Sequence, residues 1–146
     1  MIGKHVESAQ KIKESRLEII PTGYILIDGG IQSAVSYVSN TQSIPREEEN
    51  IAVSTALAGQ LLGMKTIYLE AGSGARYHVP ESMISAVRKS IDIPLIVGGG
   101  ISSGSQAKNI IEAGADLIVV GNALENNPEL ITDLSIAVHT YKSMEI

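Results

Sequence analysis

Residues 94–101 read PLIVGGGI, and residues 114–125 read GADLIVVGNALE. In each stretch a run of Leu, Ile and Val leads directly into a glycine turn. Continuous aliphatic runs without polar alternation are typical of parallel strands that are covered on both faces. After each run the apolar residues recur at the spacing of a helix. Both stretches therefore predict the strand-turn-helix unit of an α/β fold.

The same unit recurs upstream. Residues 65–70 (KTIYLE) predict a strand that ends in the turn AGSG, ahead of a helical stretch. Two short apolar runs predict extended structure on either side of the break PTG at 21–23. The predicted order is α-β-α-β-α-β-α-β-α. We expect strands at 17–20, 65–70, 94–97 and 116–120, a further extended run at 24–27, and helices at 4–15, 51–62, 81–90 and 105–113, with Asn127 capping a final helix that starts at Pro128.

Four parallel strands with intervening helices indicate an α/β fold. The pattern by itself is compatible with a doubly wound sheet and with a barrel. A complete (βα)8 barrel needs roughly 200 residues or more, so the 146 residues of this chain correspond to about half of one. No linker or low-complexity stretch divides the chain, and we expect residues 1–146 to form a single domain.

Composition excludes several functional classes. Eleven Lys and Arg against sixteen Asp and Glu give a net charge of −5 without a basic run, which disfavours nucleic-acid binding. The lack of Cys in the sequence excludes disulfides, thiolate nucleophiles and Cys-ligated metal centres. The apolar runs are too short to cross a bilayer, and residues 1–15 lack the apolar segment of a signal peptide. We therefore expect a cytoplasmic protein without a transmembrane segment.

Three predicted strands end in glycine-rich turns, at 71–74 (AGSG), 98–100 (GGG) and 121–122 (GN). Ligands of α/β folds bind at the carboxyl ends of the strands. Glycine lets backbone N–H groups approach an oxyanion closely, and a following helix N-terminus adds a favourable dipole. The alternative is that these glycines only close the turns. Because three neighbouring turns share the feature, we expect a phosphate site here.

Glu70 ends a predicted strand beside this cradle. A carboxylate repels phosphate, so we expect it to position a ligand hydroxyl or to accept its proton, with a capping or salt-bridged carboxylate as the equal alternative. Tyr68 lies two residues earlier and therefore on the same face of the strand, where it could reach a ligand or simply pack. Ser73 and Asn122 could donate to a ligand, or could serve only the turns that contain them.

Other polar residues carry weaker signals. Tyr24 could line a cleft or pack, Asp28 could only start a turn, and His78 has a small chance of touching a ligand. The three His residues match no metal-ligand spacing, and the sequence contains no HExxH, Walker A or GxSxG motif. The glycines of GGGISSG are misplaced for a dinucleotide-binding fingerprint, so a nicotinamide cofactor is disfavoured.

The sequences YLEAGSGA (68–75), PLIVGGGI (94–101) and GADLIVVGNALE (114–125), in this order, resemble the geranylgeranylglyceryl phosphate synthase family with its bacterial PcrB-type relatives. PTGYILID (21–28) resembles it too, and the similarity runs through nearly the whole chain. Members of that family are (βα)8 TIM barrels. They join a polyprenyl diphosphate to the C3 hydroxyl of sn-glycerol 1-phosphate and release diphosphate, using Mg²⁺. The resemblance implies an incomplete TIM barrel with about the last four βα units.

The same resemblance implies a site and a cofactor. The first strands of the family's barrel, which carry its magnesium ligands, have no counterpart here, so Mg²⁺ is expected as a cofactor while no metal ligand is assigned to this chain. Glu70 is the expected catalytic residue. The expected glycerol phosphate site comprises Tyr68, Leu69, Glu70, Ala71, Gly72, Ser73, Gly74, Gly99, Gly100, Gly121 and Asn122.

The resulting expectation is a prenyltransferase of ether-lipid biosynthesis, with this chain as its phosphate-binding half, inactive on its own. Its partners would be sn-glycerol 1-phosphate and a polyprenyl diphosphate, and the protein would form a homo-oligomer. One alternative is another phosphate-binding barrel enzyme, an isomerase or lyase, for which these strand ends lack a candidate Lys or paired acids. Another alternative is a half-barrel module that binds phosphate and catalyses nothing.

Overall fold

The computed structural model describes residues 6–31 and 41–142. Helices and strands alternate along the chain, as the aliphatic runs and glycine turns predict. The helices are α1 (Val6–Ser15), α3 (Glu49–Leu61), α4 (Glu81–Arg88), α5 (Gly104–Glu112), α6 (Asn122–Asn126) and α7 (Leu130–Lys142), and the strands are β1 (Thr22–Leu26), β2 (Thr66–Glu70), β3 (Leu95–Gly98) and β4 (Leu117–Val119).

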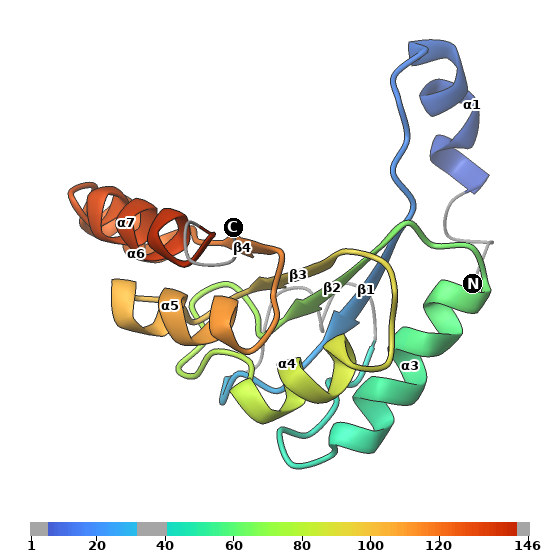
Figure 1. Ribbon diagram of the computed structural model, residues 1–146. Helices are drawn as coiled ribbons and strands as arrows, with labels where there is room; N and C mark the ends of the chain where they lie inside the picture. Colours follow the sequence, from blue (N-terminus) through green and yellow to red (C-terminus); the bar gives the residue numbers. More distant parts are fainter. Residues whose placement is uncertain (1–5, 32–40, 143–146) are drawn as a thin grey trace.

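The four strands form one parallel sheet in the order β1-β2-β3-β4. Each strand thus pairs with the next one in the sequence, and the connecting helices α3, α4 and α5 lie on the same side of the sheet (Figure 1). A doubly wound sheet would instead reverse its strand order and place helices on both faces. The arrangement is therefore an arc of a (βα)8 barrel, which confirms the α/β fold class expected from the sequence.

The covered face of the sheet holds the hydrophobic core. Ile67 and Leu69 of β2 and Leu95 and Val97 of β3 are fully buried there against α3, α4 and α5. Burying a large aliphatic side chain stabilises a fold by about 1.5–3 kcal/mol. This face therefore supplies most of the stability and fixes the register of the strands.

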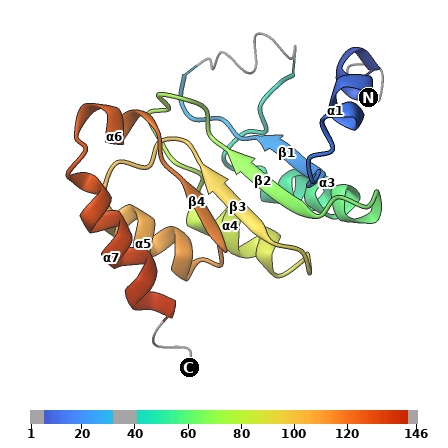
Figure 2. The same cartoon turned by 90° about the horizontal axis from the view of Figure 1, so that it is seen from above.

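The opposite face of the sheet carries no helix of the described chain, as the view from above shows (Figure 2). One register row across it joins Tyr24, Tyr68, Ile96 and Leu117. Tyr24 and Leu117, at the two edges, are 48% and 55% exposed. In a closed barrel this row would belong to the interior layers of side chains.

The strand expected at 17–20 is wrong. These residues pair with no strand, and Leu17, Ile19 and Ile20 are 60–73% exposed. Pairing with β2 begins only at Thr22. The residue before it, Pro21, accepts a hydrogen bond from the Lys65 N–H at 2.7 Å. The extended run expected at 24–27 is the one that enters the sheet, because it alone aligns with the buried strand β2.

Two further details differ from the expectation. The short helix α6 begins at Asn122, where only a turn was expected, and α7 begins at Leu130, later than Asn127. Helix α7 packs against α5, and its Leu134 is buried in the hydrophobic core. Within the part of the chain that the structure describes, no helix is both long and apolar enough to cross a bilayer.

Candidate functional site

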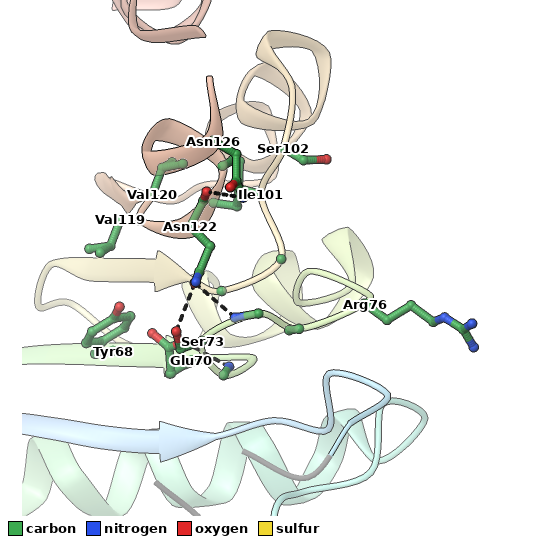
Figure 3. A pocket seen from close by; sticks show the side chains of 17 residues that line it. Tyr68, Glu70, Ser73, Arg76, Ile101, Ser102, Val119, Val120, Asn122 and Asn126 are labelled. Atoms are coloured by element: carbon green, nitrogen blue, oxygen red, sulfur yellow. Dashed lines mark hydrogen bonds between the residues drawn. The ribbon is translucent and has the colours of Figure 1, made fainter. Parts of the chain in front are cut away.

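A cleft of about 350 Å³ opens at the carboxyl ends of β2, β3 and β4 (Figure 3). Nine of the eleven residues expected to form the site line it: Tyr68, Glu70, Gly72, Ser73, Gly74, Gly99, Gly100, Gly121 and Asn122. Leu69 and Ala71 do not line it. Their side chains are buried in the core, because alternate residues of a strand point to opposite faces of the sheet.

Glu70 is nearly buried, at 8% exposure, and its carboxylate accepts hydrogen bonds from its own chain. Oε1 accepts from the Gly72 N–H at 2.8 Å. The Tyr68 hydroxyl hydrogen-bonds to the same carboxylate. A Cβ atom at Gly98 would lie 2.9 Å from Glu70 Oε2 and would also collide with the Tyr68 hydroxyl. The last residue of β3 must therefore be glycine, a requirement that the sequence analysis did not identify.

Two tyrosines stand below the carboxylate on the open face of the sheet. The rings of Tyr24 and Tyr68 meet edge to face, with centroids 5.1 Å apart and planes at 71°. Burial, followed by the charge of Glu70, raises the pKa of Tyr24 to about 12. Burial also raises the pKa of Tyr68, assisted by its hydrogen bond to Glu70. Both phenols therefore stay protonated at neutral pH, and Tyr68 donates to Glu70.

Asn122 joins two of the glycine loops. Its Oδ1 accepts from the Ser73 hydroxyl at 2.8 Å and from the Gly74 N–H at 3.0 Å (Figure 3). Because Asn122 begins α6, this contact ties the amino end of that helix to the loop after β2. Ser73 donates its hydroxyl proton to Asn122 here, which agrees with the simpler of the two roles expected for it.

The glycines of the cleft fall into two groups. Gly99 and Gly100 have φ of 82° and 70°, and a Cβ at either position would lie within 3 Å of neighbouring backbone. Gly121 has φ −117°, and a Cβ there would meet no atom within 4 Å. Tight packing and left-handed backbone demand glycine at 99 and 100. At 121 the missing side chain instead leaves open space beside the cleft.

Arg76 is a lining residue that the sequence analysis missed. It is the one cationic side chain among the described lining residues, and its guanidinium extends away from Glu70 (Figure 3). The sequence signal that could have identified Arg76 is its position just after the AGSG turn. The weaker candidates do not line the cleft: Tyr24 packs on Tyr68, Asp28 caps its own turn by accepting from the Gly30 N–H, and His78 bonds the neighbouring Val79 carbonyl.

The described residues contain no group of three or more His, Cys, Asp or Glu side chains that could hold a metal ion. The chemistry of the cleft is instead that of neutral N–H donors, one carboxylate and one nearby arginine. Such a set suits a ligand with a phosphate at one end and a hydroxyl at the other, because backbone N–H groups bind oxyanions and a carboxylate accepts from hydroxyls.

Comparison with known proteins adds independent findings. The sequence profile of the PcrB family matches residues 1–139. The chain is 50% identical over 141 residues to geranylgeranylglyceryl phosphate synthase of Spirosoma linguale, which covers 97% of this chain and 57% of that protein. It is 48% identical over 124 residues to the enzyme of that name from Pyrococcus furiosus, covering 85% and 49% of the respective chains.

A solved structure is similar to this chain over nearly its whole length. The crystal structure of (S)-3-O-geranylgeranylglyceryl phosphate synthase from Thermoplasma acidophilum, in complex with its substrate sn-glycerol-1-phosphate, matches with a TM-score of 0.86 at 39% identity. That match covers 95% of this chain and 56% of that one. The chain thus spans about half the length of the relatives that it matches.

Proposed function

The chain belongs to the PcrB family, and on that premise we propose that it forms the glycerol-phosphate-binding part of a geranylgeranylglyceryl phosphate synthase. The complete enzyme would join a polyprenyl diphosphate to sn-glycerol 1-phosphate and release diphosphate. The observation that carries this proposal is one cleft, at the carboxyl ends of three adjacent strands, in which glycine loops surround a nearly buried Glu70.

The phosphate would bind the glycine loops. Loops 98–100 and 121–122 follow two adjacent strands, which is where TIM barrels commonly bind phosphate. The open space at Gly121 supports a ligand there, since no protein atom occupies it. Arg76 lies at the rim of the same cleft and would offset part of the phosphate charge.

Glu70 would orient the glycerol hydroxyls. Its carboxylate accepts from the Gly72 N–H and from Tyr68, and it retains further lone pairs for a ligand hydroxyl. A carboxylate that already accepts two hydrogen bonds is held firmly, which favours positioning of the C3 hydroxyl toward the prenyl carbon. In the reaction that hydroxyl oxygen forms an ether bond to the prenyl carbon, while the bond from this carbon to the diphosphate breaks. The diphosphate and the hydroxyl proton leave as the other products.

Magnesium does not fit the donor set of the described residues. We propose that its ligands and most of the prenyl-binding surface belong to barrel strands outside this chain. The cytoplasmic location and the homo-oligomer expected from the sequence stay predictions. The alternative of a sugar-phosphate isomerase or lyase is not favoured, because the described residues that line the cleft include no Lys and no second carboxylate.

Calorimetric titration tests this function. The chain should bind sn-glycerol 1-phosphate more tightly than inorganic phosphate, because Glu70 adds contacts to the hydroxyls. It should bind the mirror-image sn-glycerol 3-phosphate more weakly, because its hydroxyl is misdirected. Failure to bind any of these phosphates would overturn the proposal, and equal affinity for all of them would favour the non-catalytic phosphate module.

A further inference from the structure

The loop from Ala71 to Val79, between β2 and α4, determines the shape of the cleft on two sides. Its first half contributes Gly72, Ser73 and Gly74 to the lining. Its second half lies directly against the neighbouring loop: a Cβ at Gly100 would be 2.6 Å from the Tyr77 carbonyl carbon and 2.7 Å from the His78 nitrogen. A displacement of residues 77–78 would therefore move the glycine loop after β3 as well.

Arg46 holds this second half in place from outside the cleft. Its Nη1 donates to the His78 carbonyl at 2.6 Å and to the Asp28 carbonyl at 3.3 Å. Its guanidinium also lies over the Tyr77 ring, 5.2 Å from the centroid. Arg46 precedes α3 and is half-buried, and no carboxylate of the described chain forms an ion pair with it.

The contacts of Arg46 connect three segments that are distant in sequence. The Asp28 carbonyl belongs to the loop after β1, and the adjacent Gly29 carbonyl accepts from the Arg76 and Tyr77 N–H groups at 2.9 and 3.1 Å. The guanidinium therefore bridges two loops whose backbones already touch. A planar group with several donors suits this task, since it can bond two carbonyls and stack on a ring at the same time.

We propose that Arg46 is a positioning residue for the phosphate site, acting through residues 77–78 on the glycine loop at 98–100. This inference rests on the proposed function, because it assumes that phosphate binds those loops. Arg46 itself does not line the cleft. Its contribution is to hold the N–H groups of two loops in a binding arrangement before the ligand arrives, so that binding does not have to order them.

The chain offers a matched control in Arg88. Its Nη1 also donates to a carbonyl, that of Ile93 at 3.1 Å, and pairs with Asp116 at 3.1 Å. Arg88 is likewise only partly exposed, but it lies at the end of α4 that precedes β3, away from the cleft. Replacing either arginine removes one positive charge and at least one hydrogen bond to a backbone carbonyl.

The experiment compares Arg46→Ala, Arg46→Lys and Arg88→Ala by calorimetry with inorganic phosphate and with sn-glycerol 1-phosphate. Arg46→Ala should bind both ligands about tenfold more weakly, as expected for loss of a charge-assisted hydrogen bond. Arg46→Lys should recover part of this loss, since it keeps a donor. Dilute methylguanidinium should also restore binding to Arg46→Ala. Arg88→Ala should stay within about twofold of the unmodified chain.

Hydrogen exchange provides a second readout for the same variants. Arg46→Ala should speed exchange of the amides at 72–78 and 99–100 while the β2 and β3 amides keep their protection. If Arg46→Ala binds phosphate as well as Arg88→Ala does, or if exchange rises uniformly, the positioning role is wrong although the phosphate site stands. If the unmodified chain binds no phosphate, the proposed function fails and this inference fails with it.

Discussion

The carboxylate oxygens of Glu70 accept hydrogen bonds from the same chain before any ligand binds. Gly72 donates to one of them, and Tyr68 donates to the carboxylate from the open face of the sheet. Such a group is well placed to fix the direction of a hydroxyl, whereas the sequence left ligand contact and a structural role equally open.

Glu70→Gln should therefore weaken binding of the hydroxyl end of the ligand without weakening binding of its phosphate end. The affinity for sn-glycerol 1-phosphate should fall about tenfold, because a charged acceptor of the hydroxyls is lost, while the affinity for inorganic phosphate should change little. Calorimetry with both ligands measures the ratio. An equal loss of affinity for both ligands would show instead that Glu70 stabilises the loops and does not contact the hydroxyls.

The paired tyrosines predict a pH dependence at the alkaline end. A phenol with a raised pKa in the folded chain binds its proton more tightly there than in the unfolded chain. Its contribution to stability is thus complete below the usual value near 10 and is lost as the pH rises toward 12. The melting temperature should fall over this range, and less so in Tyr24→Phe.

The measurement is an alkaline titration of phenolate absorbance, with Tyr77→Phe as the control. The late-titrating absorbance should decrease in Tyr24→Phe and in Tyr68→Phe, because the pKa of both phenols is raised by burial. An unchanged late phase in both variants would contradict the arrangement of Tyr24, Tyr68 and Glu70 described above.

At the scale of the elements, the loops after the strands differ in what they tolerate. Gly100 is locked by φ 70° and by the backbone of residues 77–78, whereas Gly121 has an ordinary φ and open space. A side chain at position 100 would therefore destabilise the fold, so its effect on ligand binding could not be separated from its effect on folding. Position 121 is the better place to test phosphate binding.

Gly121→Ala should leave the melting temperature nearly unchanged and weaken phosphate binding about tenfold or more, since the added methyl group occupies the space beside the cleft. Gly100→Ala is the contrast: it should destabilise the fold by about 1–3 kcal/mol through backbone strain. Thermal melts and phosphate titrations of both variants give the comparison. Full phosphate affinity in Gly121→Ala would exclude this loop from the site.

At the scale of the whole molecule, the described chain leaves one face and most of both edges of its sheet uncovered. β4 pairs only with β3, β1 has beyond β2 only the single bridge between Ile27 and Ile44 at its carboxyl end, and Tyr24, Leu117 and Val119 are about half exposed on the open face. Unpaired parallel edges and exposed aliphatic side chains promote association. Prenyl transfer would in addition require neutralisation of a leaving diphosphate, and Arg76 is the single cationic side chain among the described residues that line the cleft.

We expect the 146-residue chain alone to self-associate and to transfer no prenyl group. Light scattering measures the first property, and a radiolabelled prenyl-transfer assay with Mg²⁺ measures the second. Leu117→Lys should reduce association, whereas Ile136→Lys, which changes an exposed side chain of α7, should not. A stable monomer that converts both substrates would show that the open face is not what limits this chain.

The local pattern of residues was sufficient for the alternation of strands and helices and for the position of the cleft. Aliphatic runs such as 94–97 report burial on a parallel sheet, and glycines directly after them report turns at its carboxyl edge. The family resemblance added the list of eleven site residues, nine of which line one cleft. It included Leu69 and Ala71 only because the motif is contiguous, although a strand presents every second residue to the other face.

Contacts between distant segments decided the rest, because no local pattern encodes them. The apolar run 17–20 reads as a strand as well as 24–27 does, yet only the second finds a partner in register with β2. Gly98 is required because Tyr68 and Glu70 meet above it, and Arg46 is placed by carbonyls from two other loops. Pairing, close approach and bridging of this kind depend on which segments fold together, and only the packed chain specifies that.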